Sequence, residues 1–189
     1  MDKKIFLLNG PPFSGKDTLG EYVTQLNDMM VLEKFSAPLK KACRELFCLT
    51  NAEYSFFEVP HNKGTICDRL QGTSWRQAQI DMSEVFVKKN YSDEFFGNSL
   101  VERVKQSTKK FFVVSDSGFA CEARPVIRQF GNDNVFLIRL QREGMTYQAE
   151  KDSRSYLDGD ELGIKQVIVT NEDLDKFLKA GVEAIYSFI

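Results

Sequence analysis

Apolar residues in this chain gather in short runs, separated by longer stretches in which they recur every three or four positions. Most of the short runs are continuously apolar, which is typical of strands in a parallel sheet that is covered on both faces. We therefore predict strands at residues 5–8, 31–35, 111–114, 135–140 and 167–169.

The longer stretches have the spacing of amphipathic helices. Ser74 and Gln77 form a capping-box pattern at the start of one of them. Trp75, Phe95 and Phe96 suit a hydrophobic core better than a base-stacking role. Because helices alternate with strands, the pattern predicts an α/β fold with a doubly wound sheet. The predicted helices are 15–29, 38–48, 74–90, 95–108, 120–130 and 172–188.

Two segments, 49–73 and 141–165, do not follow either pattern. Long irregular segments in compact domains often serve as lids or binding loops, and otherwise they are ordinary surface excursions. For 141–165, which lies between the last two predicted strands, we expect a lid. Since no repeat, low-complexity tract or linker interrupts the chain, we expect a single domain over residues 1–189.

The most specific motif lies at residues 10–18, directly after the first predicted strand. It matches the phosphate-binding pattern of Gly, four residues, Gly and Lys, with Asp17 where that pattern has Ser or Thr. Amides at the start of a helix favour phosphate, and Lys16 adds a mobile positive charge. Pro11 and Pro12 carry no N–H and donate nothing. The expected phosphate-binding residues are Gly10, Phe13, Ser14, Gly15, Lys16, Asp17 and Thr18.

Asp116 follows the strand predicted at 111–114. Ligands of open α/β sheets gather at the carboxyl ends of the strands, so an aspartate there can orient Mg²⁺ directly or through water. The alternative is that Asp116 caps the helix predicted at 120–130.

Arg139, Arg142 and Arg154 lie in or beside the expected lid. The planar guanidinium group suits the charge of a transferring phosphoryl group, and we expect at least one of the three to contact phosphate. Neighbouring acidic residues such as Glu143 leave surface salt bridges as the alternative.

Lys40, Lys41 and Arg44 share one predicted helix, and Arg76 lies at the start of another. Both regions are candidates for binding the phosphate of an acceptor. A solvated helix face is the alternative for Lys41 and Arg44.

Composition limits the classes of partner. The 189 residues carry a net charge of −2, so nothing points to duplex nucleic acid or to a membrane surface. Four cysteines without paired or metal-binding spacing, and a single histidine, argue against a His/Cys metal site. Without a signal peptide or a membrane-length apolar run, we expect a cytoplasmic protein, or one of the host cytoplasm if viral. A homodimer stays open.

Several motifs, in order along nearly the whole chain, resemble those of phage deoxynucleoside-monophosphate kinases. Residues 14–18 resemble their SGKD-type loop, which animal phosphomevalonate kinases share. Residues 35–42 are similar to their Pro- and Lys-containing segment, and 74–76 to their Ser/Thr-x-Arg helix opening. Residues 113–122 and 166–174 resemble their Asp-containing strand end and their closing Thr-Asn junction.

The resemblance implies a three-layer P-loop kinase fold with a five-stranded parallel sheet, a helical acceptor-binding region at about 36–108 and a lid at about 141–165. It implies transfer of the γ-phosphoryl group of ATP, with Mg²⁺, to a deoxynucleoside monophosphate. The roles then expected are catalysis by Lys16, Asp116 and Arg142, metal binding by Asp17 and Asp116, substrate binding by Lys40, Arg76 and Arg154, and ATP binding by Arg139, Asn171 and the loop residues.

Two departures concern the acceptor. Gly118 stands where the relatives have arginine, and the lid pattern is reduced to residues 153–156. Two alternatives therefore stay open. One is a P-loop kinase that acts on a hydroxyl of a modified nucleotide or base, or on another small phosphorylated acceptor. The other is a nucleotide-binding protein without catalysis.

Overall fold

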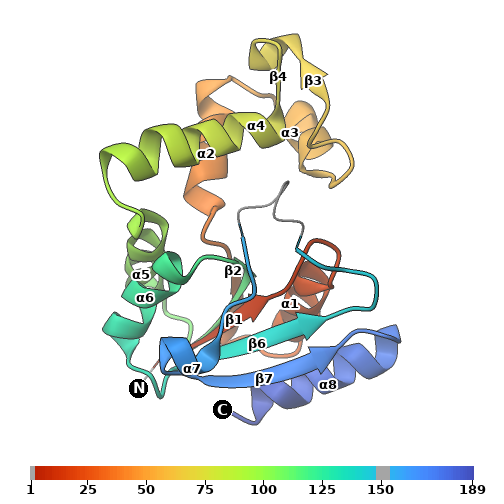
Figure 1. The fold of residues 1–189 in the computed structure, drawn as a ribbon, viewed down its shortest axis with the longest axis vertical. Helices are drawn as coiled ribbons and strands as arrows, with labels where there is room; N and C mark the ends of the chain where they lie inside the picture. The colour runs from red at the N-terminus through yellow and green to blue at the C-terminus, as the bar shows by residue number, and fades with distance from the viewer. Residues whose placement is uncertain (1–2, 148–153) are drawn as a thin grey trace. The chain divides into compact units, whose positions relative to one another are not determined.

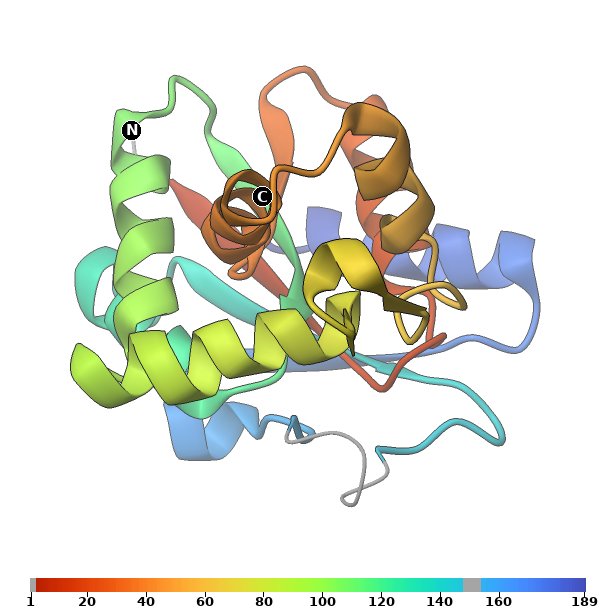
Figure 2. The same cartoon turned by 90° about the horizontal axis from the view of Figure 1, so that it is seen from above.

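The computed structural model describes residues 3–147 and 154–189. The chain divides into two compact units, of which unit 1 comprises Met1–Phe35 with Phe96–Ile189 and unit 2 comprises Ser36–Phe95. Figures 1 and 2 show the elements of each unit in two orientations. That both units form one kinase domain stays a prediction.

Unit 1 is built on a five-stranded sheet in the order β2-β5-β1-β6-β7, and all of its strand pairs are parallel. The carboxyl ends of all five strands therefore lie at one edge of the sheet. The register places Asn9 opposite both Ser117 and Arg139, so β1 and β5 end together and β6 continues to Gln141. The α/β prediction is confirmed. The strands are β1 Lys4–Asn9, β2 Met30–Glu33, β5 Phe111–Ser117, β6 Val135–Gln141 and β7 Lys165–Thr170.

Helices cover both faces of this sheet, because successive strand residues point to opposite faces and both sets are apolar. On one face, Phe6 belongs to a buried cluster with Leu19 of α1 (Lys16–Gln25) and Phe177 of α8 (Leu174–Tyr186).

The opposite face is equally apolar. Ile5 and Leu7 are fully buried there. Helices α5 (Phe95–Gln106) and α6 (Ala120–Phe130) lie on that side of the sheet in Figure 1. The layered arrangement is that of a P-loop kinase-like fold.

Unit 2 is mainly helical. Its core includes Leu39, Phe57, Leu70 and Trp75. The short strands β3 and β4 pair antiparallel. The elements of unit 2 are α2 Ala37–Leu46, α3 Asn51–Glu58, β3 Ile66–Cys67, the 3₁₀-helix η1 Asp68–Leu70, β4 Thr73–Ser74, α4 Trp75–Ile80 and the π-helix η2 Asp81–Lys88.

Some helix predictions were wrong in detail. The segment 49–73 was expected to be irregular, but it contains α3, which starts with a capping box between Thr50 and Glu53. The predicted helix 74–90 begins after its N-cap Ser74 as expected but continues as a π-helix from Asp81.

Two further boundaries and one core assignment differ from the predictions. The helix predicted at 15–29 ends at Gln25, and the last helix begins at Leu174 because Asp173 is its N-cap. Trp75 and Phe96 are buried as predicted, but Phe95 is 38% exposed.

The segment expected to form a lid contains the short helix α7, Gly159–Leu162, which is capped by Asp158. Residues 148–153 of this segment lie outside the described residues. Among the helices of the described ranges, none is long and apolar enough to cross a membrane.

Candidate functional site

The loop at residues 10–18 joins β1 to α1 and requires glycine at two positions. Gly15 has a φ of 100°, and a Cβ on it would lie 2.7 Å from Nδ2 of Asn171. A Cβ on Gly10 would lie 2.7 Å from the carbonyl oxygen of Leu140. The two glycines of the motif therefore allow a close approach of backbone that no other residue type permits.

Lys16 bridges the loop that precedes it. Its Nζ donates hydrogen bonds to the carbonyl oxygens of Gly10 and Pro11, at 2.6 and 2.7 Å. Ser14 is fully buried, and its Oγ has no hydrogen-bond partner within residues 3–147 and 154–189. A buried hydroxyl without a partner and an ammonium group in the same loop are groups that an anion would satisfy.

The start of α1 adds further donors. The first hydrogen bond of the helix runs from the N–H of Leu19 to the carbonyl oxygen of Gly15, at 2.9 Å. The amides of residues 16–18 therefore have no acceptor within the helix. Asn171 supports the loop by donating from Nδ2 to the carbonyl oxygen of Ser14, at 3.0 Å. That Asn171 also approaches adenine stays a prediction.

Asp17 and Asp116 both lie near the carboxyl end of β5. Oδ1 of Asp17 accepts a hydrogen bond from Oγ of Ser115 at 2.7 Å and forms an ion pair with Nζ of Lys34 at 2.7 Å. Asp116 follows Ser115 directly, and its Oδ1 accepts from the N–H of Phe35 at 2.8 Å. The Ser115 hydroxyl and the Asp17 carboxylate are thus in contact, and Asp116 is the next residue of the same strand.

This group suits a hard cation. Burial raises the pKa of the Asp17 carboxyl, but the hydrogen bond and charge of Lys34, helped by Ser115 and Lys16, outweigh burial and hold that pKa below its ordinary value. Asp17 is therefore ionised at neutral pH.

Mg²⁺ is typically held by one or two carboxylates together with substrate phosphates. Asp17 and Asp116 fit that pattern. In the described part of the chain, no group of three or more His, Cys, Asp or Glu could hold a metal by itself. A magnesium ion here would therefore depend on phosphate oxygens for its remaining ligands. The helix-cap alternative for Asp116 does not match the structure, because α6 has Phe119 as its N-cap and no side-chain cap.

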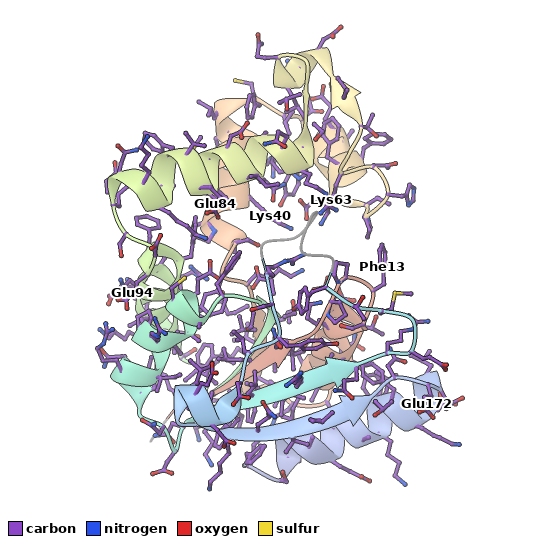
Figure 3. The ribbon with its side chains drawn as sticks, in the orientation of Figure 1. Phe13, Lys40, Lys63, Glu84, Glu94 and Glu172 are labelled. Atoms are coloured by element: carbon purple, nitrogen blue, oxygen red, sulfur yellow. The ribbon has the colours of Figure 1, made fainter. Side chains whose placement is uncertain are left out.

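Two of the predicted arginines come from the carboxyl end of β6. Nη1 of Arg142 donates to the carbonyl oxygen of Phe13 at 2.9 Å, so it contacts the tip of the loop. Phe13, labelled in Figure 3, is 65% exposed. Arg139 stacks its guanidinium carbon 4.2 Å from the ring centre of Tyr156, and its buried Nε has no hydrogen-bond partner among the described residues.

The chain that follows the third predicted arginine, Arg154, is hydrogen-bonded to residues at the ends of β1 and β5. Ser155 donates its N–H to the carbonyl oxygen of Gly118 at 3.1 Å. The Asn9 side chain donates to the carbonyl oxygen of Ser155 and accepts from the N–H of Leu157, both at 3.0 Å. The stem of Arg154 lies across Gly118, where an added Cβ would be 2.7 Å from its Cβ and Cγ. Because Gly118 has no side chain, the stem of Arg154 fills the space beside it.

A cavity of about 390 Å³ opens at the carboxyl ends of β6 and β7. Beside it, the Tyr147 hydroxyl donates to the carbonyl oxygen of Gly10 at 2.7 Å, and its ring contacts that of Tyr156 edge to face. This volume lies within the range of small-molecule pockets. The lining residues are Gln141, Arg142, Glu143, Met145, Tyr156, Thr170 and Glu172, the last labelled in Figure 3.

Lys40 and Arg76, the predicted acceptor-binding residues, belong to unit 2. Nζ of Lys40 lies 2.5 Å from Oε2 of Glu58, and Oε1 of Glu58 accepts a hydrogen bond from Nε1 of Trp75 at 2.8 Å. Arg76 is exposed, and its N–H donates to the carbonyl oxygen of Lys63 at 2.8 Å. Their role toward an acceptor stays a prediction.

Sequence reasoning missed five residues of these clusters. Asn9 and Ser115 are polar residues at strand ends, the position at which ligands of an α/β sheet gather, so a signal for them existed. Lys34, Glu58 and Tyr147 follow no motif, and only the folded chain shows what they contact.

Comparison with known proteins gives one informative match. A protein of Acanthamoeba polyphaga mimivirus named "Putative deoxynucleotide monophosphate kinase" is 28% identical over 194 residues, which cover 94% of this chain and 94% of that protein. No protein-family model matches the chain. The similarity extends over nearly the full length of both proteins.

Proposed function

We propose that this chain transfers the γ-phosphoryl group of ATP to a deoxynucleoside monophosphate. The observation that carries the proposal is the loop at 10–18, which contains the ammonium group of Lys16, the amides that open α1 and the buried hydroxyl of Ser14, which has no hydrogen-bond partner among the described residues. Donors arranged in this way suit the terminal phosphates of a nucleoside triphosphate. The similarity to a viral protein named as a deoxynucleotide monophosphate kinase supports the same activity.

The remaining groups divide between the two nucleotides. Arg142 contacts the loop and borders the cavity at β6 and β7, so we assign phosphate binding to Arg142 and the ATP base to that cavity. Arg139 stacks on the ring of Tyr156, which lines that cavity, so we assign Arg139 to the ATP side of the site as well. Lys40 and Arg76 of unit 2 are assigned to the acceptor.

Asp17 and Asp116 would hold Mg²⁺, which neutralises phosphate charge and fixes the orientation of the donor when it is bound. Lys34 balances the charge of Asp17 through their 2.7 Å ion pair. Ser115 fixes the rotamer of the same carboxylate.

In the transfer, an oxygen of the acceptor phosphate forms a bond to the γ-phosphorus as the bond from that phosphorus to the β–γ bridging oxygen breaks. ADP leaves with the electron pair of that bond. An acceptor phosphate is anionic near neutral pH and needs no general base, which agrees with a loop region rich in cations. Lys16, Arg142 and Arg154 would stabilise the charge on the transferring group.

The test is a transfer assay with ATP, Mg²⁺ and each nucleoside monophosphate in turn, with the products separated by anion-exchange chromatography. We expect a diphosphate from at least one deoxynucleotide, and a loss of about a hundredfold or more in Lys16→Met. Lys179→Met, which removes an exposed lysine of α8, is the matched control. Product only from a modified nucleotide or another phosphorylated metabolite would support a different acceptor. ATP binding without any product would support a non-catalytic protein.

A further inference from the structure

Lys16 is held on two carbonyl oxygens of the loop that precedes it. Its Nζ donates to Gly10 at 2.6 Å and to Pro11 at 2.7 Å, and both of these residues are buried. Contact with a phosphate requires the ammonium group to exchange these bonds for bonds to phosphate oxygens. The free energy of that exchange depends on what else binds the two carbonyl oxygens, because a buried carbonyl group that loses its donor is unfavourable.

Each of these two oxygens already has a second donor. The N–H of Ser14 donates to the carbonyl oxygen of Pro11 at 3.2 Å, which closes a turn within the loop. The hydroxyl of Tyr147 donates to the carbonyl oxygen of Gly10 at 2.7 Å. Lys16 can therefore turn away while both oxygens keep a hydrogen bond. The donor to Pro11 belongs to the loop itself, whereas the donor to Gly10 is a side chain 137 residues further along the chain.

The hydroxyl group of Tyr147 is oriented by a second hydrogen bond. Nδ2 of Asn9 lies 3.3 Å from the tyrosine oxygen. Because an amide nitrogen only donates, the tyrosine oxygen accepts this bond, and its own hydrogen is directed at Gly10. Asn9 is fully buried, and its Oδ1 accepts the N–H of Leu157 at 3.0 Å, which fixes the orientation of its amide group. The ring of Tyr147 is held edge to face against Tyr156, with a centroid distance of 5.1 Å.

We propose that Tyr147 is a positioning residue for Lys16, because its hydroxyl keeps the Gly10 carbonyl oxygen bonded when Lys16 turns to the phosphates of a nucleoside triphosphate. This proposal rests on the proposed function and deepens it by naming the group that allows Lys16 to change partners. Without the hydroxyl, Gly10 keeps a donor while Lys16 stays in place and loses it once Lys16 moves. The loss of the hydroxyl therefore destabilises the phosphate-bound protein and not the protein without phosphate.

The experiment measures ligand binding and thermal unfolding of Tyr147→Phe, which keeps the ring against Tyr156 and removes only the hydroxyl. Binding of ATP and of inorganic tripolyphosphate is measured by isothermal titration calorimetry without Mg²⁺. We expect both dissociation constants to rise about 5- to 10-fold. The melting temperature without ligand should stay within about 2 °C of wild type, since Lys16 then still binds Gly10. Tyr186→Phe, which removes the hydroxyl of an exposed tyrosine of α8, is the matched control and should leave all three values unchanged.

The same substitution in a Lys16→Met background separates this role from a purely structural one. Without the lysine, Tyr147 is the donor that stays on Gly10 whether or not a phosphate is bound. Adding Tyr147→Phe to Lys16→Met should therefore lower the melting temperature of the protein without ligand by about 4 °C or more. A residue that only stabilises the fold would lower the melting temperature equally in both backgrounds, and that result would overturn the proposal.

The outcomes separate this proposal from the function on which it rests. If the wild-type protein forms product and Tyr147→Phe binds both ligands as tightly as wild type, the proposal is wrong and the function stands. Weaker binding of ATP with unchanged binding of tripolyphosphate would place Tyr147 at the base and would also overturn the proposal. If no mononucleotide yields product, weaker binding of both ligands by Tyr147→Phe would still support the proposal. A wild-type protein that binds neither ligand would overturn the proposal and the function together.

Discussion

Replacing Gly118 with alanine tests whether Arg154 acts from the position that the structure gives it. The new Cβ would lie 2.7 Å from Cβ and Cγ of Arg154 and 2.8 Å from its Cδ. Carbon atoms in contact prefer about 3.5–4.0 Å, so the arginine stem or the backbone at 118 must move by about 1 Å. Gly118 is not among the glycines with a positive φ, so the effect is steric and adds no backbone strain.

The magnitude follows from what that displacement moves. Overpacking of this kind costs about 1–3 kcal/mol where the surroundings are rigid, and Arg154 is only half-buried, so we expect a melting temperature within about 4 °C of wild type. A misplacement of about 1 Å in a group that acts on the transition state can lower the rate about a hundredfold. We therefore expect kcat/KM for phosphoryl transfer to fall about 10- to 100-fold in Gly118→Ala.

The double-mutant cycle provides the sharpest form of the test. Arg154→Ala alone should lower kcat/KM by a similar factor. The double variant should be little worse than Arg154→Ala, because the guanidinium group whose displacement lowers the rate is already absent, although the new Cβ still lies 2.7 Å from the Cβ of residue 154. Gly64→Ala is the control, since a Cβ there meets no atom within 4 Å. Wild-type activity in Gly118→Ala with loss in Arg154→Ala, or additive losses in the double variant, would refute the reasoning.

Three further predictions follow from single side chains. Asp17→Asn keeps the shape but removes the charge, so the Mg²⁺ concentration for half-maximal transfer should rise about tenfold, and an unchanged value would remove Asp17 from the metal site. Burial raises the pKa of Cys43 to about 11, so iodoacetamide near pH 8 should modify the exposed Cys48 and spare Cys43 in native protein, as mass spectrometry would show. The pKa of Glu58 lies below its ordinary 4.5, so its stabilisation is complete above that pH and is lost as the pH falls through the native pKa. Urea unfolding should show wild type about 1 kcal/mol more stable than Glu58→Gln at pH 7, with the difference narrowing as the pH is lowered below 4.5, and a constant difference would contradict this.

The five strands of the parallel sheet could be predicted to within a few residues because runs buried on both faces leave a continuous apolar signature, whereas the short strands β3 and β4 were not predicted. The helix α3 could also have been predicted, since Thr50 and Glu53 form a capping box that polar and aromatic neighbours obscured. The π-helix at Asp81–Lys88 is different. Its hydrogen bonds run from i to i+5, a register that an apolar spacing of three or four residues does not specify.

The loop of the candidate site was readable from sequence because its chemistry is local. Glycines, lysine and the helix start are consecutive, so one motif contains the whole arrangement. Gly118 was not readable in the same way. In the sequence, Gly118 looks like the loss of a guanidinium group. In the fold, the absence of a side chain at Gly118 leaves room for the stem of Arg154.

Asp17 and Lys34 show what topology adds to such a motif. Because β5 lies between β2 and β1, the residue that follows β2, the end of β5 and the start of the helix after β1 meet at one edge of the sheet. Lys34, Ser115 and Asp17 are those three residues, and both partners contact the same carboxylate oxygen. A serine or threonine at position 17 would bring no charge and would need no cation beside it. Asp17, which departs from the usual loop pattern, and Lys34 therefore form one ion-paired unit. A change in either residue alters the electrostatic potential at a bound phosphate.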